Sequence, residues 1–267
     1  MAIIATPAVL LRRVDYGDFD VILTLFTEAA GKISVIAKHA KKSKKRFAGI
    51  LELFTVLKVT CQTGRRAGLL ILQEAHLEEP FTAIRESMLN TAYASYWAEI
   101  VTVWAEEAQQ LEQLYQLLVL ALDGLDRRRM DPALLNLMFQ MRFLDIAGLC
   151  PNLHYCCVCK KALDTLPHHV AGIDVPRGGV RCHGCDEGGE DHVCLSRGTI
   201  KQLQWLGQGD VKRVERLRFS PQGLQEAQQF LEAFIPFHLG KEPRSLNFLR
   251  QIRPAADADR RQTVNAR

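Results

Sequence analysis

Four cysteines stand in two pairs whose spacing suits a metal ion. Cys156 and Cys159 form one Cys-x-x-Cys pair, and Cys182 and Cys185 form a second pair after residues 160–181. Two thiolates on one tight turn can reach a single zinc ion at about 2.3 Å, and two facing turns complete a tetrahedral sphere. Four thiolates leave no open position for water or substrate, so we expect one zinc ion with a structural role.

These cysteines also have other readings. Free buried thiols rarely fall into two such pairs by chance, and a redox motif needs a single pair in a βαβ context. Gly172, Gly178 and Gly179 suit a hairpin that brings the second pair to the first. Paired cysteines are also more typical of a cytosolic metal protein than of a secreted one. The nearby residues that could replace a ligand, each expected to be a bystander, are Cys157, His154, His183, His192 and Cys194.

The second group of residues with clear chemistry is the basic run within Ala37–Phe47, which holds six lysine or arginine residues and no acid. Most charged loops are only solvated, but on a small barrel such a loop would flank the groove that holds a phosphate backbone. Its cations would release counterions from DNA and give a salt-sensitive affinity without sequence preference. The expected DNA contacts are Lys38, Lys41, Lys42, Lys44, Lys45 and Arg46, with Arg12, Arg13, Arg65 and Arg66 as extensions.

The basic run lies in a segment of β-type pattern, residues 1–80. Five stretches rich in Val, Ile, Leu, Phe and Thr are separated by Gly, Asp or Lys clusters. This is the size of an OB-fold, a five-stranded Greek-key barrel, although an SH3-like barrel would look similar. Phe19 and Phe47 are candidates either for stacking on bases or for the barrel core. The expected strands are Ala8–Val14, Val21–Thr27, Lys32–Ala37, Leu51–Cys61 and Leu69–Leu77.

Residues 81–150 change to a helical period, and we expect three helices with apolar, core-forming faces. Asp131-Pro132 marks a helix start, with an N-cap aspartate before a proline in the first turn. Gly148 suits the end of that helix. The helical pattern returns at Ser196–Leu206 and again at Pro221–Leu239, the latter after Ser220.

These segments predict an α+β protein: an N-terminal OB-fold β-barrel followed by an all-α domain with an inserted four-cysteine zinc module. The tail has no apolar face, so we expect it to be disordered. The expected divisions are residues 1–80 for the DNA-binding barrel, 81–150 and 196–253 for the two parts of a discontinuous helical domain, 151–195 for the zinc module and 254–267 for the tail.

The charge and the missing motifs narrow the function. The net charge is +4, with twelve basic against eight acidic residues in 1–80, five against nine in 81–150 and seventeen against thirteen in 151–267. No apolar run approaches the roughly 18 residues of a membrane span, and no signal peptide is recognisable, so we expect a cytoplasmic protein. Walker A, Gly-x-Gly-x-x-Gly, Gly-x-Ser-x-Gly and His-Glu-x-x-His motifs are absent, and the acids do not cluster as in a two-metal nuclease. We therefore expect no enzymatic activity.

Three stretches carry a family resemblance. The first is Tyr16-Gly17-Asp18-Phe19-Asp20 with Leu25-Phe26-Thr27, Gly31-Lys32 and the basic run; the second is Gly148-Leu149-Cys150-Pro151-Asn152-Leu153 with both cysteine pairs and Gly178-Gly179; the third is His238-Leu239-Gly240 with Arg244-Ser245-Leu246-Asn247-Phe248-Leu249. In this order, with barrel, helices and cysteine module between them, they resemble the RecO family of bacterial DNA repair and recombination mediators. The likeness spans residues 1 to 253.

The resemblance implies a DNA-binding mediator. Members of this family bind single- and double-stranded DNA, anneal complementary strands and act with RecR, often beside RecF, to load RecA onto gaps coated by single-strand binding protein. They also dock the acidic, apolar C-terminal tail of that binding protein, for which Lys241, Arg244 and Arg250 are candidate anchors here. Some members lack the zinc cysteines, which agrees with a structural role for the metal. The alternative is a zinc-containing protein-interaction adaptor with only incidental DNA affinity.

Overall fold

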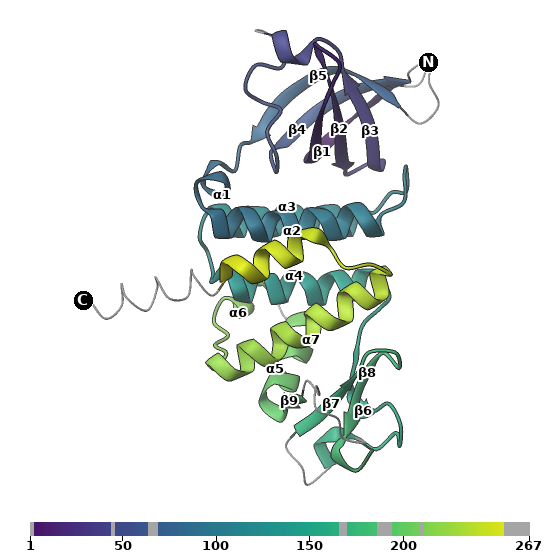
Figure 1. Cartoon of the computed structure of the whole chain (residues 1–267), viewed down its shortest axis with the longest axis vertical. Coiled ribbons are helices and arrows are strands. Elements are labelled where there is room, and N and C mark those ends of the chain that lie inside the picture. The colour runs from purple at the N-terminus through teal and green to yellow at the C-terminus, as the bar shows by residue number, and fades with distance from the viewer. Residues whose placement is uncertain are drawn as a thin grey trace, which may run out of the picture. The chain divides into compact units, whose positions relative to one another are not determined.

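The computed structural model describes residues 3–43, 46–63, 69–165, 170–185, 194–208 and 211–253 (Figure 1). The chain divides into two units. Unit 1 comprises Met1–Arg127 and Arg244–Arg267, and unit 2 comprises Arg128–Pro243. The predicted fold class is confirmed: a β-barrel comes first in the chain, and helices with a small cysteine-bearing sheet follow.

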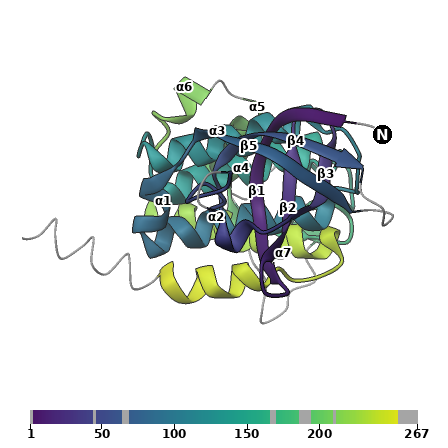
Figure 2. The ribbon, with the colours of Figure 1, turned by 90° about the horizontal axis from the view of Figure 1, so that it is seen from above.

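Five strands of unit 1 form a closed barrel, seen from above in Figure 2. They are β1 (Ile3–Tyr16), β2 (Asp20–Thr27), β3 (Gly31–Ala37), β4 (Val56–Thr63) and β5 (Leu70–Glu79). Their order around the barrel is β1-β2-β3-β5-β4, and β4 pairs again with β1. The pair β3–β5 is parallel, and the other pairs are antiparallel. This is the topology of an OB-fold, whereas an SH3-like barrel would be antiparallel throughout.

The barrel core follows from the alternation of side chains along each strand. β2 buries Val21, Leu23 and Leu25, and the odd-numbered apolar residues of β3 and β4 are buried in the same way. Phe47, from the connection between β3 and β4, is only 3% exposed and belongs to this core. Phe19, in contrast, is 37% exposed between β1 and β2, so only one of the two phenylalanines is available to a ligand.

The start of β4 differs from the prediction. The strand was expected from Leu51, but it begins at Val56. Phe54 has a left-handed backbone with φ of +70°, and the Thr55 hydroxyl donates to the carbonyl oxygen of Glu52 at 2.8 Å. Residues 51–55 therefore form a turn and not a strand. The apolar side chains of Leu51 and Phe54, which suggested a strand, are buried although they belong to this turn.

The helices of unit 1 are α1 (Thr82–Glu86), α2 (Met88–Trp104), α3 (Glu112–Asp126) and a helix at residues 244–253. The first expected helix is two helices, because Ser87 is extended and its hydroxyl accepts a hydrogen bond from the Asn90 amide at 3.3 Å. The carboxylate of Glu99 on α2 accepts from the amides of Arg244 and Ser245, which attaches helix 244–253 to α2 (Figure 1).

Unit 2 contains α4 (Pro132–Ile146), α5 (Arg197–Gln208), α6 (Val211–Val214) and α7 (Pro221–Leu239). Both predicted helix starts are confirmed: the Asp131 carboxylate accepts from the Ala133 amide at 2.8 Å, and the Ser220 hydroxyl accepts from the Gly223 amide at 3.0 Å. No helix within the described parts of the chain combines the length and apolar character needed to span a membrane.

The small sheet of unit 2 has the order β6-β8-β7-β9. Its strands are β6 (Asn152–Cys156), β7 (Val170–Asp174), β8 (Gly179–Cys182) and β9 (Cys194–Ser196).

Candidate metal centre and nucleic-acid interface

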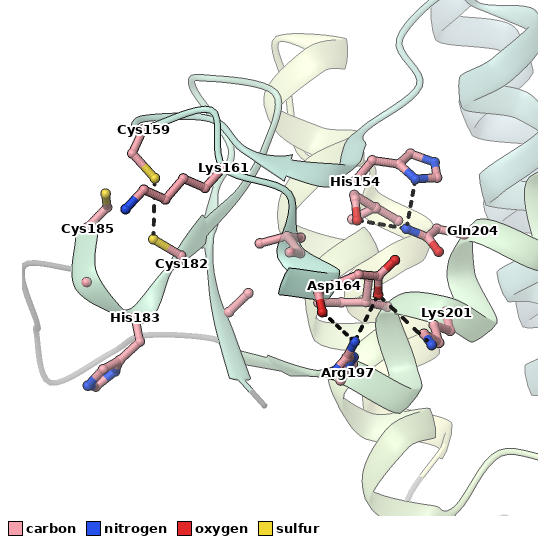
Figure 3. A pocket seen from close by; sticks show the side chains of 15 residues that line it. His154, Cys159, Lys161, Asp164, Cys182, His183, Cys185, Arg197, Lys201 and Gln204 are labelled. Carbon is pink, nitrogen blue, oxygen red and sulfur yellow. Dashed lines mark hydrogen bonds and ion pairs between the residues drawn. The ribbon is translucent and has the colours of Figure 1, made fainter. Parts of the chain in front are cut away.

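The ligand atoms of Cys156, Cys159, Cys182 and Cys185 all lie within 4.8 Å of one another, as the two Cys-x-x-Cys pairs predicted. Because β6 and β8 are parallel, they end at the same edge of the sheet, with a cysteine as the last residue of each. Each strand then enters a tight turn that returns a second cysteine toward the first. Figure 3 shows three of the four sulfur atoms facing one another beside the end of β8.

Backbone amides prepare this cluster for negative charge. The amides of Cys159 and Cys182 donate to the sulfur of Cys156 at 3.5 and 3.4 Å. Burial raises the pKa of Cys156, but the amide hydrogen bonds outweigh burial and lower it to about 6. Hydrogen bonds with the thiols of Cys182 and Cys159 raise the pKa of Cys185 to about 12. Cys156 therefore forms a thiolate more readily than Cys182 or Cys185. This sulfur donor set suits zinc.

The bystanders expected from the sequence stay outside the four-sulfur cluster where the structure describes them. Cys157 is buried against Asp174, and burial first, then the charge of that aspartate, raises the pKa of its thiol. The Nδ1 atom of His154 lies 3.3 Å from the Nε2 atom of Gln204. His183 and Cys194 are not part of the cluster, and His192 lies outside the described residues.

A cavity of about 250 Å³ lies between the cysteine cluster and α5 (Figure 3). Part of its wall is apolar, and part carries charge. Arg197 donates to the backbone carbonyl of Asp164 at 2.8 Å, and Lys201 lies 4.0 Å from the carboxylate of the same aspartate. The apolar residues of the wall are Leu153, Leu163, Ala171 and Ile200.

On the barrel, the basic loop folds against the turn between β1 and β2. The Lys41 amide donates to the carbonyl of Phe19 at 3.0 Å, and the His39 amide donates to the carboxylate of Asp20 at 2.8 Å. The ammonium of Lys42 lies 4.0 Å from the centroid of the Phe19 ring, and the His39 ring stacks on that ring at 6.0 Å. Phe19, His39 and Lys42 therefore form one exposed aromatic and cationic cluster, which we call the barrel cluster.

The predicted cations of the barrel have different surroundings. Lys41 donates to the carbonyl of Gly17 at 2.8 Å and pairs with Asp15 at 3.2 Å. Arg46 donates to the carbonyls of Leu72 and Gln73 at 3.2 and 2.6 Å, and Arg13 donates to that of Leu51 at 3.1 Å. Lys41 and Arg46 therefore fasten the basic loop, and Arg13 fastens the segment at Leu51 and Glu52. Lys38, Lys42 and Arg12 are exposed, and Lys44, Lys45, Arg65 and Arg66 lie outside the described residues.

Sequence reasoning missed the partners that hold the loop. Asp15 and Gly17 were not expected to hold the loop, although an acid at the end of β1 is a suitable ion-pair partner for a lysine of a neighbouring loop. The candidate anchors at the end of the chain are all exposed. Arg244 and Arg250 lie on helix 244–253 with the half-exposed Phe248, while Lys241 follows α7 in unit 2.

Comparison with known proteins agrees with this arrangement. Residues 1–81 match the family model described as Recombination protein O N terminal, and residues 85–247 match Recombination protein O C terminal. The chain belongs to the RecO family. This is the family that the motifs resembled, so the chain is a RecO-type DNA repair and recombination protein.

RecO relatives align over nearly the full chain. The DNA repair protein RecO of Desulfatibacillum aliphaticivorans is 41% identical over 251 residues, which cover 94% of this chain and 97% of the relative. That of Desulfosudis oleivorans is 42% identical over 254 residues, 93% and 98% of the two chains. The more distant RecO of Symbiobacterium thermophilum is 29% identical over 255 residues, 96% and 100% of the two chains.

Proposed function

We propose that this chain is a non-enzymatic recombination mediator that binds and anneals single-stranded DNA in the cytoplasm, at the nucleoid. With RecR, and in some settings RecF, it helps to load RecA onto gaps coated by single-strand binding protein. The observation that supports this proposal is the barrel cluster, an exposed phenylalanine ring beside a lysine on an OB-fold. Such a pair can stack on a base of any sequence and neutralise the adjacent phosphate.

Charge reversal in the basic loop tests this function. Lys38→Glu with Lys42→Glu removes exposed cations without touching Lys41, which fastens the loop. Fluorescence anisotropy at about 0.1 M salt should show strongly weakened single-strand binding, and the salt slope should fall by about 0.7 for each lost phosphate contact. A wider variant adds Lys44→Glu and Lys45→Glu.

Lys58→Glu is the matched control, because Lys58 is an exposed lysine on β4 of the same barrel and outside the loop. Equal losses in the control and the loop variants would point to a general charge effect. Unchanged affinity and salt slope in the loop variants would rule out the loop as a DNA contact.

We also propose that Cys156, Cys159, Cys182 and Cys185 hold one zinc ion with a structural role. The support is the convergence of four sulfur atoms at the ends of two parallel strands. A bound zinc ion would neutralise the thiolates and fix both turns, and four sulfur ligands would leave it no position for substrate. The metal would stabilise the small sheet and would not take part in a reaction.

The cavity beside the cysteine cluster favours a second candidate function, that of a protein-interaction adaptor. Apolar walls with Arg197 and Lys201 suit an acidic, apolar peptide. Separately from this cavity, we propose Arg244 and Arg250 of unit 1, and Lys241 of unit 2, as candidate anchors for the tail of single-strand binding protein. Binding assays with bare single strands and with that tail peptide separate the two functions, since an adaptor binds only the peptide tightly. A strand-annealing assay with the loop variants then tests the mediator directly.

A further inference from the structure

A shallow groove in unit 2 brings an exposed indole together with three cationic side chains. Its volume is about 360 Å³. The lining residues are Lys201, Gln202, Trp205, Arg213, Arg216 and Leu217. Among the residues that the structure describes, none that lines the groove is acidic, so its polar surface is cationic.

The indole of Trp205 is accessible from the groove. Trp205 is 39% exposed on α5, whereas Trp97 in unit 1 is fully buried. Lys201 stands one helical turn before Trp205 on α5, about 6 Å along the axis. A flat aromatic face with a cation one turn away is the arrangement that single-stranded nucleic acid uses, because every base can stack on it.

Arg213 and Arg216 come from a short segment, α6 and the turn after it, which is hydrogen-bonded to α5. Val214 of α6 is fully buried between the exposed Arg213 and Arg216. The Arg216 amide donates to the Arg213 carbonyl at 3.1 Å, and Gln202 of α5 donates to the Arg218 carbonyl at 2.8 Å. The second bond ties α5 to the segment that follows α6, so the groove is built by the fold.

The local charge is high for this chain. Residues 197–218 hold six basic and two acidic residues, so this short segment alone carries a net charge of +4, equal to that of the whole chain. Of the two acids, Glu215 does not line the groove, and Asp210 lies outside the described residues. Asp164 is 4.0 Å from Lys201, at the cavity beside the cysteine cluster.

We propose that this groove is a second contact for single-stranded DNA, in which Trp205 stacks on a base while Arg213 and Arg216 neutralise neighbouring phosphates. The inference rests on the proposed DNA-binding function and adds a site in the unit that does not contain the barrel. An acidic peptide is a poorer fit, because the ring stands in an open groove and offers no enclosed apolar pocket. Two contacts on one chain raise the effective concentration of a strand that one contact has bound.

The test uses the full-length, zinc-loaded protein and a deoxythymidine oligonucleotide of about 40 nucleotides, longer than two sites of up to about 16 nucleotides each. Trp205→Ala should weaken binding roughly tenfold, and Trp205→Phe, which keeps an aromatic face, should retain most of the affinity. Arg213→Gln with Arg216→Gln should lower the salt slope by about 1.4. Binding should also quench tryptophan fluorescence in the wild type and much less in Trp205→Phe. Lys201 stays unchanged, because it also lines the cavity.

Arg128→Gln is the control for charge, since Arg128 is exposed in unit 2 and outside the groove. Groove variants that bind DNA within about twofold of wild type, with an unchanged slope, overturn the inference. Groove variants that lose binding of an acidic peptide but keep wild-type binding of DNA also overturn the inference. If the barrel variants still lose binding in those cases, the proposed function stands without this site. Losses in the groove variants alone support the groove and remove the barrel contact instead.

Discussion

Glu99 on α2 forms the N-terminal cap of a helix that begins 145 residues later in the chain. Its Oε1 atom accepts from the Arg244 amide at 3.0 Å, and its Oε2 atom accepts from the Ser245 amide at 2.8 Å and the Ser245 hydroxyl at 2.5 Å. The first amides of a helix have no acceptor within the helix and carry partial positive charge. A carboxylate from another helix therefore satisfies them better than a neutral side chain.

Glu99→Gln should lower the free energy of unfolding by about 1–2 kcal/mol, because the amide side chain loses the charge and one acceptor oxygen. Urea unfolding measures the loss, and hydrogen exchange should rise selectively in residues 244–253. Glu106→Gln is the control, because Glu106 is an exposed acid of the same unit that follows the end of α2. Equal effects of the two substitutions would contradict the capping role.

Cys182→Ser should reduce the zinc content from about one per chain to near zero and lower the thermal midpoint, since a three-thiolate site holds zinc poorly. Elemental analysis and thermal unfolding measure both effects. Cys150→Ser serves as the control, because Cys150 is exposed and outside the cluster. A purified wild-type protein that is folded and free of metal would refute the proposal.

Phe19→Ala and Phe47→Ala should have opposite consequences. Phe19 is exposed in the barrel cluster, so its loss should weaken single-strand binding by about 1–3 kcal/mol and leave stability nearly unchanged. Phe47 is in the barrel core, so its loss should cost about 3–5 kcal/mol of stability. DNA titration and urea unfolding of both variants check this. If Phe19→Ala were strongly destabilised, the Phe19 ring would have a role in stability and not in DNA binding.

Glu226→Gln should destabilise unit 2 in a pH-dependent way. The Ser196 amide and the Thr199 hydroxyl donate to Glu226 at 2.8 and 2.6 Å. Burial raises the pKa of this carboxyl, but these hydrogen bonds outweigh burial and hold the pKa below its usual range. Because the folded pKa lies below the unfolded value of about 4.3, the carboxylate stabilises the fold above that pH, and this stability is lost as the pH falls through the folded pKa.

Urea unfolding of wild type and Glu226→Gln should therefore differ by about 1–2 kcal/mol near neutral pH. The difference should disappear only as the pH falls through the lowered folded pKa of Glu226. Both proteins contain the same cysteines, so acid release of a metal affects them equally. A difference that stays constant with pH would show that packing, and not charge, explains the effect.

Local patterns predicted much of this fold because their causes are local. The Cys-x-x-Cys pairs each close within one turn, and Asp131 and Ser220 cap helices that begin at the next residue. The alternation of buried and less buried residues along β2 and β3 follows directly from the burial of one face of each strand. Residues of this kind can be placed from sequence because their partners are a few positions away.

The features that escaped prediction depend on partners distant in the chain. The cap of helix 244–253 comes from Glu99, and the acceptors of Arg46 lie on β5. The basic run suggested equivalent cations, but Lys41 and Arg46 support the loop while Lys38 and Lys42 face solvent. No spacing rule separates these roles, because the strand pairing that creates them is a tertiary contact.

The attachment of residues 244–253 to α2 has a consequence for the order of synthesis. Unit 1 is built from the first and the last parts of the chain, so the ribosome makes all of residues 128–243 before the donors for Glu99 exist. Domains tend to fold as they emerge, which lets the second unit form while the first still lacks a helix. Completion of the first unit is thus a late, long-range loop closure, and a premature stop near residue 243 would leave an incompletely folded first unit for proteases to remove.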